Sequence, residues 1–258
     1  MFSYSAPCFS KGSILKKEML ENLRDFPRNF AQIFFKNYSD GIIAGTDLEV
    51  GQGQITVTKG IIKYGDRLFM LESDRQVPYY NTNREIVIKV KFTDEAVNRD
   101  FIYQNAEILL DENTTVDAGE MELGRFKLRE GAVLRSDYSD FYDFATEYNT
   151  INIINTRYAA PWQSTMNPKV LQYFARVVLQ SATENFYDIS FAMQCMNQEI
   201  VHRKLIIHYL AGRLGIEAKD YTNMELYKYL ALIVKESGSG IKRRVELRQK
   251  GPARIIVD

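Results

Sequence analysis

The sequence predicts an α+β protein with an N-terminal helix, a small antiparallel β-sandwich or barrel, and a C-terminal helical bundle followed by a basic C-terminal arm. Three observations predict this order. Apolar residues recur at helical spacing over residues 13–37, alternate with polar residues between 42 and 135, and return to helical spacing after Asp137. The expected parts are a helical lead-in (1–40), a β-rich domain (41–136), a helical domain (137–237) and a flexible joint with the arm (238–258).

The first helix is predicted from one apolar stripe within residues 13–37. Its members recur at spacings of three and four, as on one face of a helix: Leu15, Met19, Leu23, Phe26, Phe30 and Ile33. Ser13 has a side chain suited to an N-cap. Pro27 lacks a backbone N–H and clashes with the preceding turn, so we expect a break or kink there, with Pro27 opening a second short helix.

Alternating apolar residues predict about seven short strands between residues 42 and 135. The clearest is 85–92, which has the pattern of a half-buried strand, and Gly65-Asp66 predicts a tight hairpin. The apolar residues change parity across Gly124, which predicts a β-bulge. Such a bulge keeps four apolar side chains on the core face: Met121, Leu123, Phe126 and Leu128.

Helical spacing returns in the second half of the chain. An apolar stripe over 141–158 predicts one helix, and Asn167-Pro168 is a start signal for the next. A long helix is expected over about 186–212, with Gly215 as a left-handed C-cap. Thr222 and Glu225 have capping-box spacing at the start of a fourth helix. Four helices of this length predict a small bundle.

Composition excludes several classes of protein. The chain has 258 residues, of which 45% are hydrophobic, and its 33 Lys and Arg balance its 33 Asp and Glu. This balance argues against a dedicated nucleic-acid-binding or membrane-surface protein. The only cysteines, Cys8 and Cys195, exclude a disulfide framework. With no secretory signal pattern at the N-terminus and no apolar run long enough to span a bilayer, we expect a soluble protein made in the cytoplasm.

Two groups of residues were weighed as metal or acid–base sites. Glu199 and His202 have Glu-x-x-His spacing, but a di-iron site needs a second such pair, and His208 would lie on another face of the helix. Four carboxylates cluster at the start of the helix predicted over 141–158: Asp137, Asp140, Asp143 and Glu147. Since no oxygen-ligand loop accompanies them, we interpret this cluster as the solvated, dipole-stabilised start of a helix.

No other motif of catalysis is present. Gly51-Gln-Gly53 leads into a strand and lacks a third glycine, and Gly238-Ser-Gly240 fails the phosphate-loop spacing. Cys195 falls in an apolar stretch, where an inert core thiol is expected. We therefore expect no catalytic, cofactor-binding or metal-binding residue, and a function other than that of an enzyme.

The C-terminal arm carries the strongest local charge. Residues 241–254 have six basic residues against Glu246 alone, a net charge of +5: Lys242, Arg243, Arg244, Arg248, Lys250 and Arg254. The simplest interpretation is a solvated tail. Alternating apolar residues in the same segment favour a second interpretation, in which the arm docks onto an acidic protein surface. On that interpretation the partner-docking residues are Lys242, Arg243, Arg244, Arg248 and Lys250.

The front half resembles proteins of phage tails and tail-like contractile particles, in particular baseplate and tail-fibre attachment proteins. Four short segments carry the resemblance, three of them with glycines: 34–45, 54–65, 68–71 and 123–131. It covers about residues 14–131. The resemblance implies synthesis in a host cytoplasm and assembly, in multiple copies, into a virion or tail-like particle with other tail or baseplate proteins. It implies no cofactor.

Three functions are consistent with the sequence. The first is a structural component of a phage tail or tail-like particle, at the baseplate. The second is a carbohydrate- or receptor-binding module with Tyr79 and Tyr80 as a stacking platform, against which the only tryptophan, Trp162, lies in the helical half. The third is a metal-dependent hydrolase that uses the acidic cluster. The first agrees with the resemblance and with a chain rich in tyrosine, which is favoured at interfaces.

Overall fold

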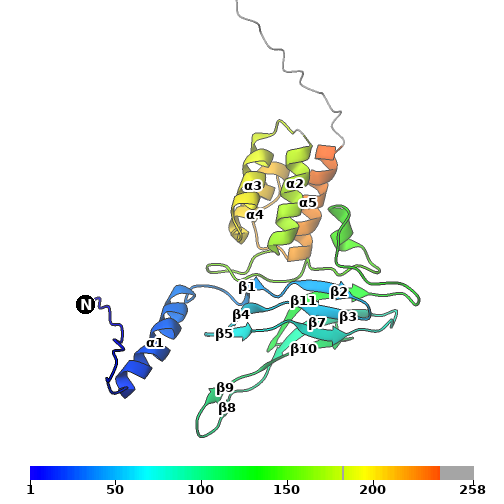
Figure 1. Ribbon diagram of the computed structural model, residues 1–258. Helices are drawn as coiled ribbons and strands as arrows, with labels where there is room; N and C mark the ends of the chain where they lie inside the picture. Colours follow the sequence, from blue (N-terminus) through cyan, green and yellow to red (C-terminus); the bar gives the residue numbers. More distant parts are fainter. Residues whose placement is uncertain (182, 239–258) are drawn as a thin grey trace, which may run out of the picture.

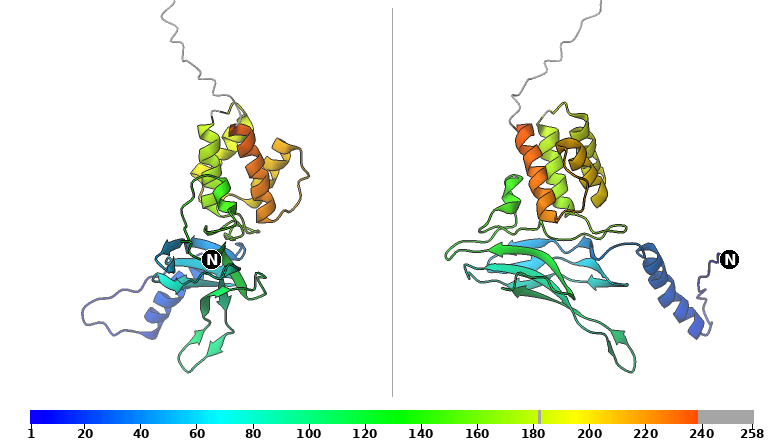
Figure 2. Two further views of the ribbon diagram at one scale, coloured as in Figure 1. Left: turned by 90° about the vertical axis from the view of Figure 1, so that its right-hand side faces the viewer. Right: turned by 180° about the vertical axis from the view of Figure 1, so that it is seen from behind.

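The computed structural model describes residues 1–181 and 183–238. It has an N-terminal helix, antiparallel sheets and C-terminal helices, which confirms the predicted α+β class (Figure 1). The helices α2 to α5 stand at one end, the sheets lie beneath them, and α1 projects to the side (Figures 1 and 2). The basic arm and Gly240 lie outside the described residues.

The strands form four antiparallel sheets, and no sheet of the described residues closes into a barrel. Their orders are β1-β4-β5, β2-β3-β6, β10-β7-β11 and β8-β9. The predicted hairpin at Gly65-Asp66 is confirmed as the turn from β4 to β5. The strands are β1 (Gly41–Gly45), β2 (Leu48–Gly51), β3 (Gln54–Val57), β4 (Gly60–Tyr64), β5 (Arg67–Leu71), β6 (Arg75–Pro78), β7 (Glu85–Phe92), β8 (Ala96–Val97), β9 (Ile102–Tyr103), β10 (Ala106–Asp111) and β11 (Glu120–Lys127).

The central strand β7 is buried on both faces, so its description as half-buried was wrong. Lys89 is fully buried, and its ammonium group donates to Asp111 at 2.9 Å, to Glu120 at 3.0 Å and to the carbonyl of Thr115 at 2.6 Å. Burial lowers the pKa of Lys89, but these two carboxylates outweigh it and the net shift is upward. The charged residue Lys89, which alternates with apolar residues along β7, therefore belongs to an internal ion pair and does not lie on a solvent-exposed face.

The predicted β-bulge at Gly124 is confirmed. The pairing of β11 with β7 shifts register between Glu122 and Gly124, and the four apolar residues around the bulge are all buried. A side chain at Gly124 would meet Leu48 Cδ1 at 2.8 Å and the carbonyl oxygen of Asn152 at 3.2 Å. Glycine fits here because the strand passes close to Leu48 of β2 and to the connecting segment, residues 128–167, which leads from β11 to the C-terminal helices.

The prediction of a helix over 141–158 was wrong. These residues belong to the connecting segment, 128–167, which is extended apart from one short 3₁₀ helix, Tyr142–Ala145. It pairs with the strands through isolated bridges, for example Asn152 with Arg125 and Tyr158 with Ile42. The apolar residues in it are covered by the sheets on one side and the helices on the other, so their spacing did not report a helical period.

Four helices follow where three were expected, since the fourth predicted helix was the one over 141–158: α2 (Pro168–Gln180), α3 (Phe186–Asn197), α4 (Arg203–Leu214) and α5 (Asn223–Gly238). Three start and stop signals are confirmed. Asn167 accepts from the N–H of Lys169 at 2.9 Å, and Gly215 caps α4 with φ 68°. Glu225 accepts from the N–H of Thr222 at 2.7 Å, and the Thr222 hydroxyl accepts from the N–H of Glu225 at 3.2 Å.

The long helix expected over 186–212 is two helices. The chain is extended at Gln198 (φ −112°, ψ 130°), and Val201 enters the core. The Val201 carbonyl accepts from the Thr165 hydroxyl at 2.6 Å, which ties the break to the connecting segment. Burial of Val201 and this hydrogen bond compensate for the helical bonds lost at the break.

The first helix, α1 (Lys17–Phe34), runs through Pro27 without a break, so no second helix begins there. Lys16 occupies the N-cap position in place of Ser13, and its side chain makes no cap hydrogen bond. No residue of α1 is buried. The carbonyl that Pro27 leaves unpaired is therefore open to hydration, which lowers the cost of proline inside the helix.

Candidate functional site

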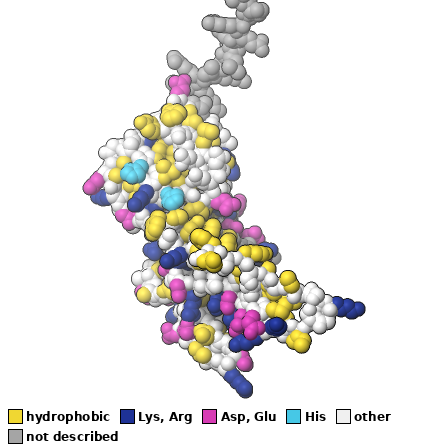
Figure 3. Space-filling model, turned by 90° about the vertical axis from the view of Figure 1, so that its left-hand side faces the viewer, with side chains coloured by type: hydrophobic (Ala, Val, Ile, Leu, Met, Phe, Trp, Pro, Cys, Tyr) yellow, Lys and Arg dark blue, Asp and Glu magenta, His cyan; other side chains and the backbone are white. Residues whose placement is uncertain are grey.

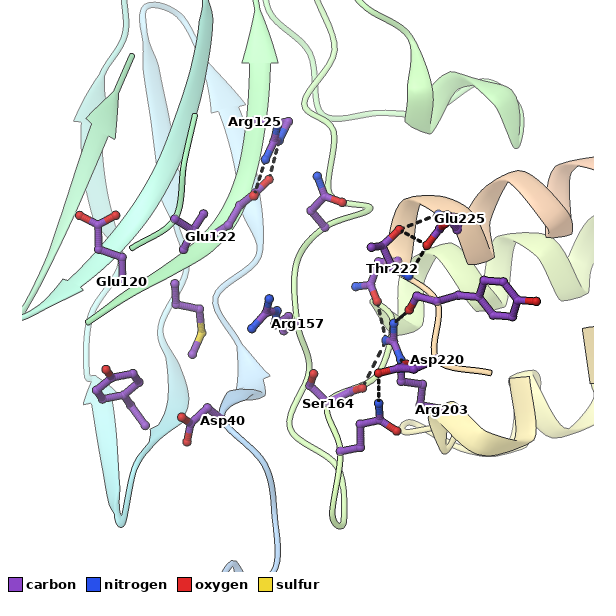
Figure 4. Close-up of a pocket in the computed structure, with 17 residues that line it drawn as sticks. Asp40, Glu120, Glu122, Arg125, Arg157, Ser164, Arg203, Asp220, Thr222 and Glu225 are labelled. Atoms are coloured by element: carbon purple, nitrogen blue, oxygen red, sulfur yellow. Dashed lines mark hydrogen bonds and ion pairs between the residues drawn. The ribbon is translucent and has the colours of Figure 1, made fainter. Parts of the chain in front are cut away.

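A cleft of about 640 Å³ lies between the sheets and the helices, along the connecting segment (Figure 4). Five carboxyl groups and three guanidinium groups line it, so its charge is negative overall. The carboxylates are Asp40, Glu120, Glu122, Asp220 and Glu225, and the guanidinium groups are Arg125, Arg157 and Arg203.

Arg203 organises the helical wall of the cleft. It is buried at the first position of α4 and donates to Asp220 at 3.1 Å, to Asn223 at 2.7 Å and to the backbone carbonyl of Tyr221. It also donates to the carbonyl of Ser164 in the connecting segment at 3.4 Å. One guanidinium thus joins the starts of α4 and α5 to the connecting segment, a structural task that uses its fixed fork of donors.

The opposite wall belongs to β11. Arg125 forms a bidentate ion pair with Glu122, with N–O distances of 2.8 and 2.7 Å (Figure 4). Glu120 is held by Lys89, which lowers the pKa of its carboxyl, and the N–H of Thr222 lowers the pKa of Glu225 across the cleft. The exposed Arg157 is the one guanidinium of the cleft without an ion-pair partner in the described part of the chain.

This arrangement holds the chain together more readily than it performs chemistry. A general acid needs a carboxyl group whose pKa is raised towards neutrality, whereas the shifted carboxylates here are held ionised by donors. Within residues 1–181 and 183–238, no cluster of His, Cys, Asp and Glu could hold a metal ion. Burial raises the pKa of the Cys195 thiol to about 12, so it stays protonated as expected of a core thiol.

The acidic cluster weighed from the sequence is dispersed by the structure. Asp143 is buried and bound to Arg135, at 2.5 and 2.6 Å, and is therefore not the solvated group that we expected. Asp140 accepts from the N–H of Tyr142 at 2.8 Å and caps the 3₁₀ helix. Glu147 pairs with Lys127 at 3.0 Å. Each of these three carboxylates has its own structural partner.

The structure does not bring the remaining residues singled out from the sequence together into one site. Glu199 and His202 fall in the break between α3 and α4, so they do not share a helix. Tyr79 is buried, with its ring centroid 6.0 Å from that of Phe126, and cannot serve as a stacking platform, whereas Tyr80 is exposed. Residues 51–53 form the turn between β2 and β3. The five basic residues proposed for docking lie outside the described part of the chain.

Three surfaces of exposed, large apolar side chains remain. We call them the α1 face (Leu20, Leu23, Phe26, Phe30, Ile33 and Phe34), the hairpin tip at β8–β9 (Val97, Phe101, Ile102 and Tyr103), and the α3 face (Phe186, Met193 and Met196). Figure 3 shows apolar side chains gathered between the helices and the sheets on the side from which α1 projects. Apolar patches of this kind mark sites of interaction with other molecules.

An aromatic ridge connects α1 with the body of the protein. Its ring centroids lie 6.0 Å apart for Phe30 and Phe34, 4.9 Å apart for Phe34 and Phe35, and 5.1 Å apart for Phe35 and Tyr38. Beside it, Trp162 is 76% exposed with φ 71°. Its backbone N–H donates to the carbonyl of Asn37 at 2.7 Å. Sequence reasoning placed Trp162 in the helical half, but it lies in the connecting segment.

No family model and no curated protein matches the chain. The solved structures that it is similar to include one described as the crystal structure of TssK, at 9% identity and a TM-score of 0.42, covering 92% of this chain and 73% of that one. Another is the type VI secretion system TssK-TssF-TssG baseplate subcomplex, at 9% identity and a TM-score of 0.37, covering 91% of this chain and 100% of that one.

The second structure is described as a baseplate subcomplex, and neither description mentions a phage or a virion. Both TM-scores lie below 0.5, and a likeness of this size does not transfer a function. Among the described helices, none is long and apolar enough to cross a bilayer.

Proposed function

We propose that the chain is a structural component of the baseplate of a phage tail or tail-like particle, that it assembles there with other baseplate proteins, and that it does so without enzymatic activity. One observation carries the proposal: large apolar side chains stay uncovered on three separate surfaces of a chain whose interior is otherwise well packed. A subunit of a large assembly buries such surfaces against several neighbours at once. Synthesis in the host cytoplasm belongs to the same proposal.

The hairpin tip offers the sharpest test of this function. We expect Phe101→Ser to weaken binding to a baseplate partner at least about fivefold, because an exposed aromatic anchor at an interface is worth more than about 1 kcal/mol. The full chain is co-expressed with the proteins encoded by the neighbouring genes, and the complexes are purified and their affinity measured. Since the tip is outside the core, the thermal midpoint should not change.

The matched control is Arg99→Ser, an exposed residue of the same hairpin that carries no apolar surface. It should leave binding intact. If the chain forms no complex of defined stoichiometry with any of these proteins, the proposed function is wrong.

We also propose that the arm contributes to docking through Lys242, Arg243, Arg244, Arg248 and Lys250. Its net positive charge follows from the sequence, and a neutral chain with one basic segment suits an acidic protein surface. We expect Arg243→Glu with Arg244→Glu to slow association with the baseplate partner and to weaken its dependence on salt. Unchanged association kinetics over a range of ionic strength would contradict this role for the arm.

A further inference from the structure

The α1 face has the pattern of a helix that packs against other helices. Its apolar residues follow the alternating spacing of four and three that is typical of a coiled-coil seam: Met19, Leu23, Phe26, Phe30 and Ile33. Leu20 and Phe34 widen this seam on one side. The six residues of the α1 face are between 50% and 74% exposed, so the described chain leaves most of this face uncovered.

The width of the apolar face indicates how many neighbours it needs. At 100° per residue, the apolar arc from Ile33 to Leu20 spans about 140°. A two-stranded coiled coil covers only the narrower seam. An arc of this width is covered when a helix has a neighbour on each side, which requires at least three helices.

The charges of α1 favour copies of the same helix as those neighbours. Three basic and three acidic residues lie on the opposite face and cancel: Lys17, Arg24, Arg28, Glu18, Glu21 and Asp25. They also pair within the helix, with Lys17 to Glu21 at 3.3 Å and Arg28 to Asp25 at 3.3 Å. The residues that flank the apolar arc on one edge, Asn22 and Asn29, are uncharged. Identical helices can therefore meet without like-charge repulsion.

The same charge pattern argues against other occupants. A helix that lies on an anionic membrane surface carries an excess of Lys and Arg on its polar face, which α1 lacks. A strongly acidic or basic partner would likewise find no net charge to complement.

We propose that α1 is an assembly helix that packs its apolar face against α1 of at least two further copies of this chain, in a parallel, cyclic bundle. A closed ring of three or more identical subunits runs its helices parallel. The six residues from Phe35 to Asp40 then lead each copy into its own β1 at the same end of the bundle. This inference goes beyond the proposed function, and the two fail separately.

The test measures the mass of the full-length protein by light scattering during size-exclusion chromatography, over a range of concentrations. We expect an oligomer of three or more copies, and a monomer for Phe30→Glu, with an apparent dissociation constant raised at least about 100-fold because a charge replaces an aromatic anchor in the seam. The control Gln32→Glu makes the same change of charge on the opposite face and should assemble as the wild type does. Both variants should keep the thermal midpoint, since α1 has no buried residue.

A cross-linking experiment checks the parallel register. In a Cys8→Ser background, Phe26→Cys should be joined to itself between copies by a short bis-maleimide, because seam positions meet their equivalents in a parallel bundle. Arg28→Cys, on the charged face, should not. Cross-linking at 28 but not at 26 would overturn the arrangement.

Three results would overturn the inference as a whole. They are a wild-type monomer at all concentrations, an oligomer that Phe30→Glu leaves intact, and a monomer that binds vesicles of anionic lipid through α1. A chain that is monomeric alone yet binds baseplate proteins would leave the proposed function standing. Copies that assemble through α1 but bind no baseplate protein would support the inference about α1 and contradict the proposed function.

Discussion

Replacing Phe174 by alanine is expected to lower the free energy of unfolding by about 4 kcal/mol. Phe174 lies in α2 and is fully buried. Its ring lies 5.9 Å from Phe141, 5.9 Å from Phe191 and 6.1 Å from Tyr209, between centroids. The substitution removes a large apolar side chain and its aromatic contacts with the connecting segment, α3 and α4 at once, and leaves a cavity between them.

Urea unfolding, followed by circular dichroism, measures this loss. Leu179→Ala is the matched control, since Leu179 belongs to the same helix but is 42% exposed, and it should cost about 1 kcal/mol or less. Equal losses for the two variants would show that Phe174 is not the centre of the helical core.

The second large effect is expected for Asp143→Asn, with a loss of about 3 kcal/mol. The Asp143 carboxylate is buried and accepts from both terminal nitrogens of Arg135, from the N–H of Ser139 at 2.9 Å and from the hydroxyl of Thr146 at 2.9 Å. The amide cannot replace the charge, so Arg135 loses its counter-ion. Removing one partner of a buried pair costs about 3 to 5 kcal/mol, and the partial exposure of Arg135 places this case at the lower end.

The pH dependence of stability gives an independent readout. The Arg135 guanidinium, helped by the backbone of Ser139 and by two hydroxyl groups and opposed by burial, holds the pKa of Asp143 well below its usual range. In the unfolded chain the pKa is about 3.9. The contribution of Asp143 is therefore complete above about pH 5 and is lost as the pH falls towards the lower, folded pKa.

Urea titrations of the wild type and of Asp143→Asn between neutral and acid pH compare the two slopes. The difference in unfolding free energy should shrink as the pH falls below about 4, where the wild-type carboxylate begins to gain a proton in the unfolded state. A difference that stays constant down to acid pH would show that the charge of Asp143 is not what stabilises the segment. Subtracting the variant removes the contributions of the other carboxylates with lowered pKa values.

These two residues bear on the proposed assembly, because the connecting segment fixes the helices relative to the sheets. Tyr138 donates to the carbonyl of Ile151 at 2.8 Å and accepts, through its own carbonyl, from Tyr173 of α2 at 3.2 Å. Tyr227 of α5 donates to the carbonyl of Phe141 at 2.8 Å. A subunit that binds several neighbours needs its surfaces held at constant relative positions, and this hydrogen-bonded segment can hold the α3 face and the hairpin tip in that way.

Local signals in the sequence were enough to place many elements. The cap at Asn167, the capping box at Thr222, the left-handed Gly215 and the bulge at Gly124 were all predictable, because each depends on the conformation of a few consecutive residues. The apolar stripe of α1 was also visible, and an exposed helix shows its period undisturbed.

Other features depended on neighbours that are distant in the chain. The extended segment over 141–158 takes that form because it lies between sheets and helices, and the break at Gln198 brings Val201 into the core. Lys89 is an internal cation only because β10 and β11 bring Asp111 and Glu120 to it. A single sequence shows the charge of such residues and not their partners.

The sequence by itself determined the α+β class, the order of its parts and most of the ends of its helices, since these follow from local backbone preference and from the period of apolar residues. Only the tertiary structure decided which apolar residues are covered. Pro27 does not interrupt α1, and no residue of the stripe on that helix is buried, whereas a stripe of similar spacing over 141–158 is buried from two sides. The physical reason is that burial depends on contacts between segments far apart in sequence, which the spacing of residues does not record.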